Sequence, residues 1–73
     1  METRRSRYQN RLIAAVQRVR DAKALVERQR ARIEILKAKD LPIEQAEALL
    51  KTYIRTLALL QEHERGLRVE LQK

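Results

Sequence analysis

The sequence predicts an all-α protein: an antiparallel two-helix hairpin, coiled-coil-like, that dimerises into a four-helix bundle. Apolar residues recur every seven residues in two separate segments, as they do in coiled coils. A single Pro and a single Gly leave too few turns for a β-sandwich or an α/β domain. The composition is rich in strong helix formers, and regularly spaced hydrophobic residues, 44% of the chain, argue against disorder.

The first helix is expected over about residues 4–38. One row of its heptad pattern is formed by Leu12, Val19, Val26 and Ile33. A second row, offset by three residues, is formed by Tyr8, Ala15, Ala22, Gln29 and Leu36. Two rows with this offset are the a and d positions of a helix that packs along one seam. Lys37 and Lys39 near the end of this helix complement its dipole.

The chain is expected to turn at residues 39–41, just before Pro42. Pro suits the first position of a helix, and the residue before a Pro is driven out of the α region. A single continuous helix through the whole chain is the alternative. Pro42 and the change of heptad register across the break argue against it.

The second helix is expected over about residues 42–71, with Glu44 complementing the dipole of its first turn. Its first row consists of Ile43, Leu50, Leu57 and Leu71, with Glu64 as a polar interruption. Its second row consists of Ala46, Tyr53, Leu60 and Leu67. The pattern therefore predicts a second seam of the same type as the first.

A connection this short makes the two helices antiparallel neighbours, so residues 1–73 are expected to form one domain. Folding about residue 40 pairs positions whose numbers add up to about 79, for example Val26 with Tyr53 and Ala22 with Leu57. The predicted hairpin seam comprises Leu12, Val19, Val26, Ile33, Leu36, Ile43, Leu50, Tyr53, Leu57, Leu60 and Leu67. Gln29 and Glu64 are polar within this seam, and we hypothesise that they fix its register or the oligomeric state.

Self-association is expected because the chain has more apolar residues than one seam uses. Cys, Phe and Trp are absent, so neither disulfides nor large aromatic rings stabilise this small domain. The predicted contact face for a second copy comprises Leu25, Leu49, Ile54 and Leu59. One alternative is a monomer with scattered surface hydrophobic residues, which are common. Another is a different protein that covers the same face.

The net charge of +7 resides in the first 40 residues, where 12 Lys and Arg residues accompany 5 acidic ones. The candidate phosphate contacts are Arg4, Arg5, Arg7, Arg11 and Arg18. Arg suits phosphate, so a nucleic acid is a candidate partner, and a membrane surface is the least favoured one. However, no aromatic residues interleave the arginines for base stacking, and no known DNA-binding motif is present. The alternative is a solvated helix face with weak cross-helix ion pairs, such as Arg30 with Glu47.

The sequence carries no recognisable catalytic machinery, and we expect no enzymatic activity, no metal and no cofactor. His63 is the only His, Ser6 is the only Ser, and Cys is absent. A metal site needs three or four converging ligands, and a phosphate-binding loop needs more than one Gly. Tyr8 and Tyr53 fall on the seam, so we expect them to pack there rather than stack on a cofactor.

From Arg28 onward the chain resembles a group of very small bacterial proteins of unassigned function. The resemblance rests on Arg28-Gln29-Arg30, Ile33, Leu36, Ala46, Leu49, Leu50, Leu57 and Leu60-Gln61-Glu62-His63-Glu64-Arg65-Gly66-Leu67. It covers about two thirds of the chain and departs at residues 39–42, where those proteins often have Gly. The resemblance implies a bacterial, cytoplasmic helical hairpin and carries no activity to transfer. The absence of Cys and of a targeting segment also fits a cytoplasmic protein.

We therefore expect a non-enzymatic structural or protein-interaction module that self-associates through helix packing. The alternative function is that of a basic accessory protein that binds nucleic acid through the Arg-rich edge of its first helix.

Overall fold

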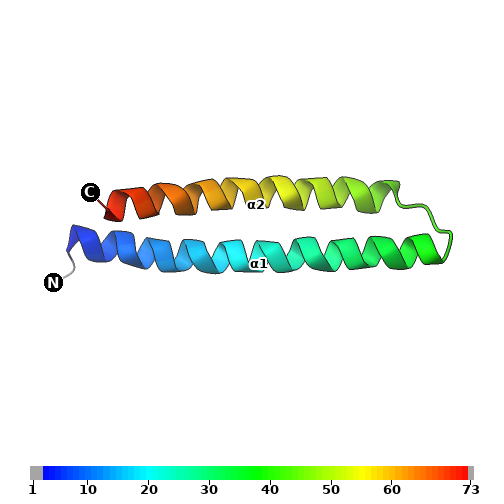
Figure 1. Ribbon diagram of the computed structural model, residues 1–73, viewed down its shortest axis with the longest axis horizontal. Helices are drawn as coiled ribbons and strands as arrows, with labels where there is room; N and C mark the ends of the chain where they lie inside the picture. The colour runs from blue at the N-terminus through cyan, green and yellow to red at the C-terminus, as the bar shows by residue number, and fades with distance from the viewer. Residues whose placement is uncertain (1–2, 73) are drawn as a thin grey trace.

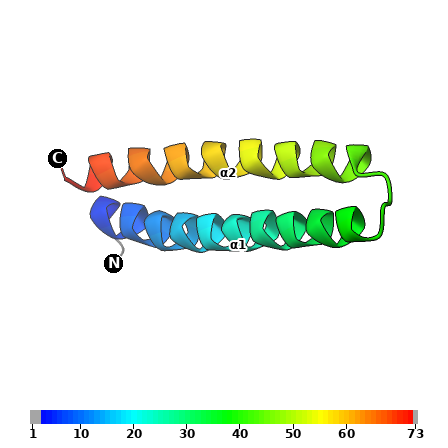
Figure 2. The same ribbon diagram turned by 45° about the vertical axis from the view of Figure 1, so that its right-hand side comes forward.

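The computed structural model describes residues 3–72 and consists of two helices, α1 (Arg4–Ala38) and α2 (Glu44–Leu71). The helices lie side by side and run in opposite directions, joined at one end by a short connection (Figures 1 and 2). No strand occurs within residues 3–72. The predicted all-α helical hairpin is confirmed.

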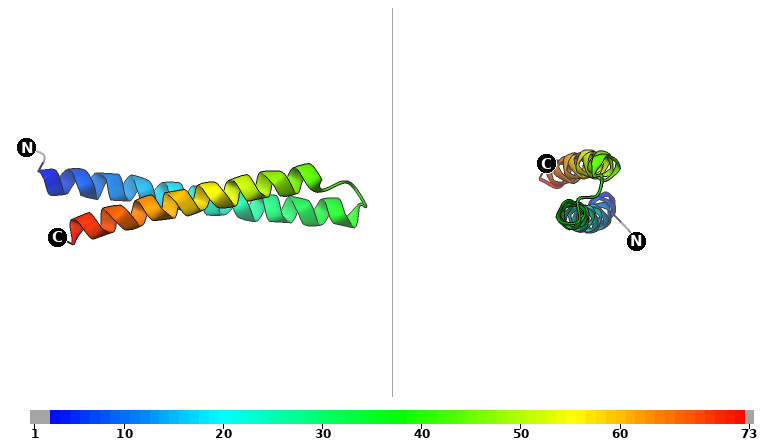
Figure 3. Two further views of the ribbon diagram at one scale, coloured as in Figure 1. Left: turned by 90° about the horizontal axis from the view of Figure 1, so that it is seen from above. Right: turned by 90° about the vertical axis from the view of Figure 1, so that its right-hand side faces the viewer.

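The hairpin is a thin rod with extents of 58 × 16 × 14 Å. Its radius of gyration is 16.9 Å, whereas a compact domain of this length has a radius of gyration of about 11 Å. The two helices cross at a shallow angle, and the end-on view shows no further element above or below the pair (Figure 3). Each helix therefore packs on one side only, and a large part of its surface faces solvent.

Thr3 caps the N-terminus of α1. Its backbone is extended, with φ −87° and ψ 165°, and its side-chain oxygen accepts a hydrogen bond of 3.1 Å from the backbone N–H of Ser6. A Thr in this position satisfies one of the backbone donors that the first helical turn leaves without a partner. The start of α1 at Arg4 follows from this cap, which the heptad pattern does not reveal.

α1 ends in a Schellman motif. Asp40 adopts the left-handed conformation with φ 55°, and the backbone N–H of Leu41 donates to the carbonyl of Leu36 at 3.0 Å. The N–H of Asp40 itself donates to the carbonyl of Lys37 at 3.1 Å. This pair of bonds satisfies the last carbonyl groups of the helix and reverses the chain. The turn therefore depends on Asp40 as well as on Pro42.

α2 begins at Glu44, two residues later than the start at Pro42 that the sequence pattern predicts. Ile43 is the N-cap residue, and its carbonyl accepts the N–H of Glu47 at 2.8 Å. Pro42 lies before the helix because the chain must first cross the distance between the two helix axes, which is about 8–10 Å in packed helices. Glu44 and Glu47 then place negative charge in the first turn, where the helix dipole favours it.

The core of the hairpin follows the predicted seam. The buried residues of α1 are Ala15, Val19, Ala22, Val26, Gln29 and Ile33, and the buried residue of α2 is Leu67. The other predicted seam residues are half-buried, namely Leu12, Leu36, Ile43, Leu50, Tyr53, Leu57 and Leu60. The large side chains of α2 cover the small ones of α1, whereas the small side chains of α1 cover those of α2 only in part. Burial is therefore deep on α1 and incomplete on α2.

Gln29 is the buried polar residue of the seam, with 6% of its surface exposed. Its Nε2 donates a hydrogen bond of 2.9 Å to the backbone carbonyl of Ala46 in α2. A shift of the helices by one turn would bury this amide without its partner, at a cost of about 1–3 kcal/mol. The bond therefore supports the hypothesis that Gln29 fixes the register. The other polar seam residue, Glu64, is half-buried and accepts a bond of 3.0 Å from Nε of Arg68.

Candidate functional site

The seam divides the remaining heptad positions between two broad faces of the hairpin. We define the first face by the edge residues Arg4, Arg11, Arg18, Leu25 and Arg32 of α1, with Leu49, Thr56, His63 and Glu70 of α2. We define the second face by Val16, Lys23, Arg30 and Lys37 of α1, with Glu47, Ile54, Gln61 and Arg68 of α2. In agreement, Arg32 and Leu49 line one surface hollow, whereas Arg30 and Glu47 line another. Each face is therefore contributed by both helices.

Four large exposed apolar side chains lie on the side of the first face, two at its edge and two, Ile35 and Leu59, three residues after the edge residues Arg32 and Thr56. They are Leu25, Ile35, Leu49 and Leu59, and we call them the central apolar patch. Leu25 and Leu49 flank the seam with 40% and 39% of their surface exposed. Thr52 and Thr56 of α2 fall on the same side of the helix as Leu49 and Leu59 and add no charge. The patch occupies the middle of the rod and its turn-proximal part.

Ile54 does not belong to this patch, so the predicted contact face of Leu25, Leu49, Ile54 and Leu59 is not continuous. Ile54 follows Glu47 by seven residues and therefore lies on the second face. The wide apolar arc of α2 straddles the seam, so its two edges point to opposite sides of the hairpin. Ile54 is 40% exposed, almost the same as Leu49.

Three more exposed apolar residues, Ile13, Leu41 and Val69, are not among the residues singled out from the sequence. Ile13 directly follows the seam residue Leu12 within the apolar run of residues 12–16. Because all residues of this run are apolar, their hydrophobicity alone does not show which of them faces solvent. The heptad position of Ile13, one step after the seam, is the signal that identifies it.

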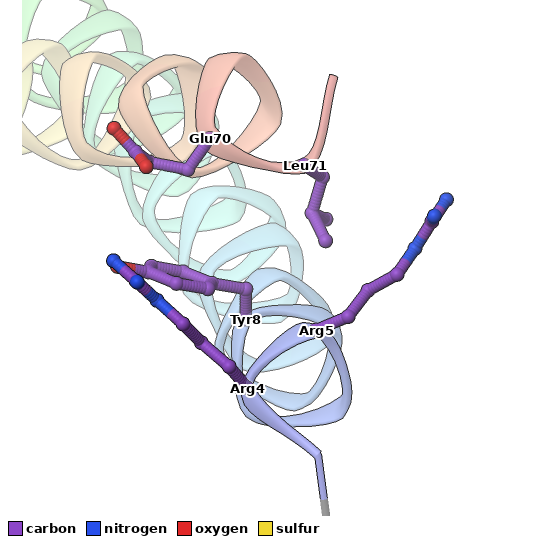
Figure 4. A pocket seen from close by; sticks show the side chains of 5 residues that line it. All are labelled: Arg4, Arg5, Tyr8, Glu70 and Leu71. Carbon is purple, nitrogen blue, oxygen red and sulfur yellow. The ribbon is translucent and has the colours of Figure 1, made fainter. Parts of the chain in front are cut away.

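Arg5 lies apart from the other candidate phosphate contacts. Arg4 and Arg11 belong to the edge of the first face, and their guanidinium carbons lie 5.8 and 5.7 Å from the centre of the Tyr8 ring. Figure 4 shows Arg4 extended alongside Tyr8, whereas Arg5 points away from both toward the side of Leu71. Arg4, Arg5 and Tyr8 line a shallow hollow together with Glu70 and Leu71 at the end of the hairpin opposite the turn.

One aromatic residue, Tyr8, lies among these arginines, and its ring is occupied by guanidinium groups. Tyr8 lies within cation–π distance of both Arg4 and Arg11. Its heptad position explains the arrangement, because residues four before and three after a helical position lie on the same side of the helix. The ring is half-buried on the seam and serves as a platform for two arginine side chains.

The ion pairs between described residues lie within single helices. Lys37 pairs with Glu34, Arg65 with Glu62 and Arg68 with Glu64. Such exposed pairs contribute about 0.3–0.5 kcal/mol each. Arg30 and Glu47 line one hollow, but their charged groups do not come within ion-pair distance, so the suggested cross-helix pair between them is wrong.

Among residues 3–72, no group of three or more His, Asp and Glu side chains is placed to hold a metal ion. His63, the only His of the chain, is exposed on α2. Tyr53 lies half-buried on the seam, as Tyr8 does. Neither described helix is long and apolar enough to span a bilayer. Two features of the hairpin surface bear on binding, the central apolar patch and the arginines.

The chain was also compared with known proteins. It matches no protein-family model, no curated protein and no solved structure. Function must therefore be inferred from these two surface features of the hairpin.

Proposed function

We propose that this chain is a non-enzymatic structural or interaction module that self-associates, two hairpins packing through the central apolar patch into a four-helix assembly. The observation that carries the proposal is the position of Leu25, Ile35, Leu49 and Leu59 on one face. Several large apolar side chains exposed on one face of a small protein favour a contact site there. A second copy of the chain carries the same apolar patch, so the patches of two copies can cover each other and no other protein is needed.

The exposed area of the hairpin supports this proposal. One chain exposes 6072 Å², whereas a monomeric protein of 8.7 kDa is expected to expose about 4,700 Å². The excess exceeds the roughly 800 Å² that each partner buries in a standard protein interface. A hairpin with so thin a core gains stability from a second layer, because two helices alone bury little apolar surface.

The charges favour one arrangement of the two copies. In α1, Arg28 and Arg32 lie between Leu25 and Ile35, whereas the α2 part, Leu49 to Leu59 on this face, carries no charge. Packing α1 of one copy over α2 of the other keeps the arginines of the two copies apart. The two turns then lie at the same end of the assembly. Packing α1 over α1 would instead bring like charges together, which is unfavourable.

Leu49→Glu and Ile54→Glu form a matched pair of variants that tests the proposal. The two positions are 39% and 40% exposed in the hairpin, but they lie on opposite faces. Leu49→Glu places a charge in the proposed contact of both copies, so we expect the dimer dissociation constant to rise by about 100-fold or more. Ile54→Glu should leave the dimer intact. Analytical ultracentrifugation measures both, and dissociation by Ile54→Glu but not by Leu49→Glu would show that the contact uses the second face.

The arrangement of the copies can be tested separately. The chain has no Cys, so Lys39→Cys introduces a single spin-label site next to the turn. With both turns at one end, the two labels of a dimer lie close together. If the copies run in opposite directions, a separation near the length of the rod, 58 Å, is expected instead. Pulsed electron resonance distinguishes the two distances.

A further inference from the structure

The first face continues beyond the central apolar patch, away from the turn, as a row of basic residues. Arg4, Arg7, Arg11 and Arg18 follow one another along the edge of α1 at spacings of three, four and seven residues, and we call them the arginine stripe. All four are exposed. The stripe covers about 21 Å of helix at ~1.5 Å per residue, in the half of the rod that lies away from the turn. The next acidic residue along the same edge is Asp21.

The structure holds part of the stripe in place. Arg4 and Arg11 lie 5.8 and 5.7 Å from the ring centre of Tyr8, and these two arginines with Arg7 line a hollow around that ring. An arginine side chain that is already ordered loses less conformational entropy when it binds a ligand. Arg7 and Arg18 make no ion pair with any described residue. The stripe therefore presents both positioned and available guanidinium groups.

We propose that the arginine stripe binds the phosphate backbone of double-stranded nucleic acid. The guanidinium group pairs with phosphate oxygens through two parallel hydrogen bonds, which the ammonium group of Lys does not match. Arg4, Arg11 and Arg18 recur at about 10.5 Å along a straight helix. A duplex presents one phosphate charge per about 1.7 Å of its axis, so a rigid row of arginines meets phosphates along its length.

The same observations disfavour two other anionic partners. Single strands are bound by stacking their bases on open aromatic rings. Tyr8 is flanked by guanidinium groups, and Tyr53 is half-buried on the seam. A helix that lies on a membrane needs a free apolar face beside its basic one. Along residues 4–18 the apolar seam of α1 is covered by α2, which leaves Ile13 as an exposed large apolar side chain but no continuous apolar face to insert. The stripe shares the first face with the central apolar patch, so this inference is made for the single hairpin, and a second copy packed along the whole face competes with the duplex.

The salt dependence of binding tests the proposal quantitatively. Four phosphate contacts predict that the logarithm of the association constant falls with the logarithm of salt concentration with a slope of about −3.6. Affinity for a random duplex of about 20 base pairs should then fall roughly 150-fold between about 50 and 200 mM salt. Fluorescence anisotropy of labelled duplex DNA and duplex RNA measures this slope, and both duplexes should bind because only phosphates are contacted.

A matched pair of double variants identifies the residues. Arg7→Gln with Arg11→Gln should reduce the slope to about −1.8, because each lost phosphate contact lowers its magnitude by about 0.9. Lys51→Gln with Arg55→Gln removes the same net charge from exposed positions of α2 and should leave the slope unchanged. Circular dichroism confirms that both variants remain helical.

Three results would overturn the proposal. The first is the absence of duplex binding at about 50 mM salt, where electrostatic binding is strong. The second is an equal loss of slope in the α2 variant, which would make the binding a general effect of net charge. The third is binding to vesicles of anionic phospholipid without binding to either duplex.

Discussion

Gln29→Glu tests whether a single hydrogen bond sets the register of the hairpin. The amide of Gln29 donates to the carbonyl of Ala46 at 2.9 Å and is 6% exposed. An ionised carboxylate has the same shape but no proton to donate, so it would face the carbonyl oxygen as a second acceptor. The lost hydrogen bond costs about 1 kcal/mol, and leaving a buried group without a partner costs about 1–3 kcal/mol, with more for a charged group. We therefore expect destabilisation by at least about 2–4 kcal/mol.

Thermal unfolding followed by circular dichroism measures this effect at a fixed protein concentration. For a chain of this size, 2–4 kcal/mol corresponds to a fall of roughly 8–30 °C in the melting temperature. The difference from the wild type should narrow at acidic pH, because a protonated carboxyl group again has a proton to donate. Gln61→Glu is the control, since Gln61 is exposed on α2 and its change should stay within about 0.5 kcal/mol. A Gln29→Glu variant as stable as the control at neutral pH would refute the register role.

The remaining predictions concern backbone conformation and packing, and unfolding experiments measure all of them. Asp40→Gly should stabilise the hairpin by about 0.5–1 kcal/mol, because Asp40 has φ 55° and Gly adopts this conformation without a steric penalty. Gly66→Ala should stabilise α2 by up to about 1 kcal/mol, since a Cβ atom there would meet nothing within 4 Å. Ala15→Leu should destabilise the hairpin by about 1–3 kcal/mol, because Ala15 is 1% exposed and the larger side chain has no room. An opposite sign for any of the three would contradict the corresponding local geometry.

The packing of the hairpin was predictable from the sequence because one period controls it. Residues such as Val19, Val26 and Ile33 recur at the heptad interval, and burial follows that interval directly. The ends of the helices were less predictable. The positions of the helix ends depend on local features, such as the side-chain cap by Thr3 and the left-handed backbone conformation of Asp40. The spacing of hydrophobic residues indicates neither of these features.

The candidate surfaces were predictable only in part. The sequence shows that Leu49 and Ile54 are apolar residues outside the seam. They were predicted to share one contact face, but their heptad positions lie on opposite sides of the seam. Similarly, charge composition marks Arg4 and Arg5 alike, whereas the structure directs their side chains to different sides (Figure 4). A side chain's direction depends on its angle around the helix, so adjacent residues of one chemical type serve different surfaces.

Self-association is the central claim, and sedimentation equilibrium of the wild-type chain tests it most directly. We predict a particle of twice the 8.7 kDa mass of one chain at micromolar concentration. The dimer should dissociate on dilution, and Leu49→Glu should shift the equilibrium to monomer. A wild-type chain that sediments as a single 8.7 kDa species up to about millimolar concentration, where even contacts of about 4 kcal/mol would be seen, would contradict the claim.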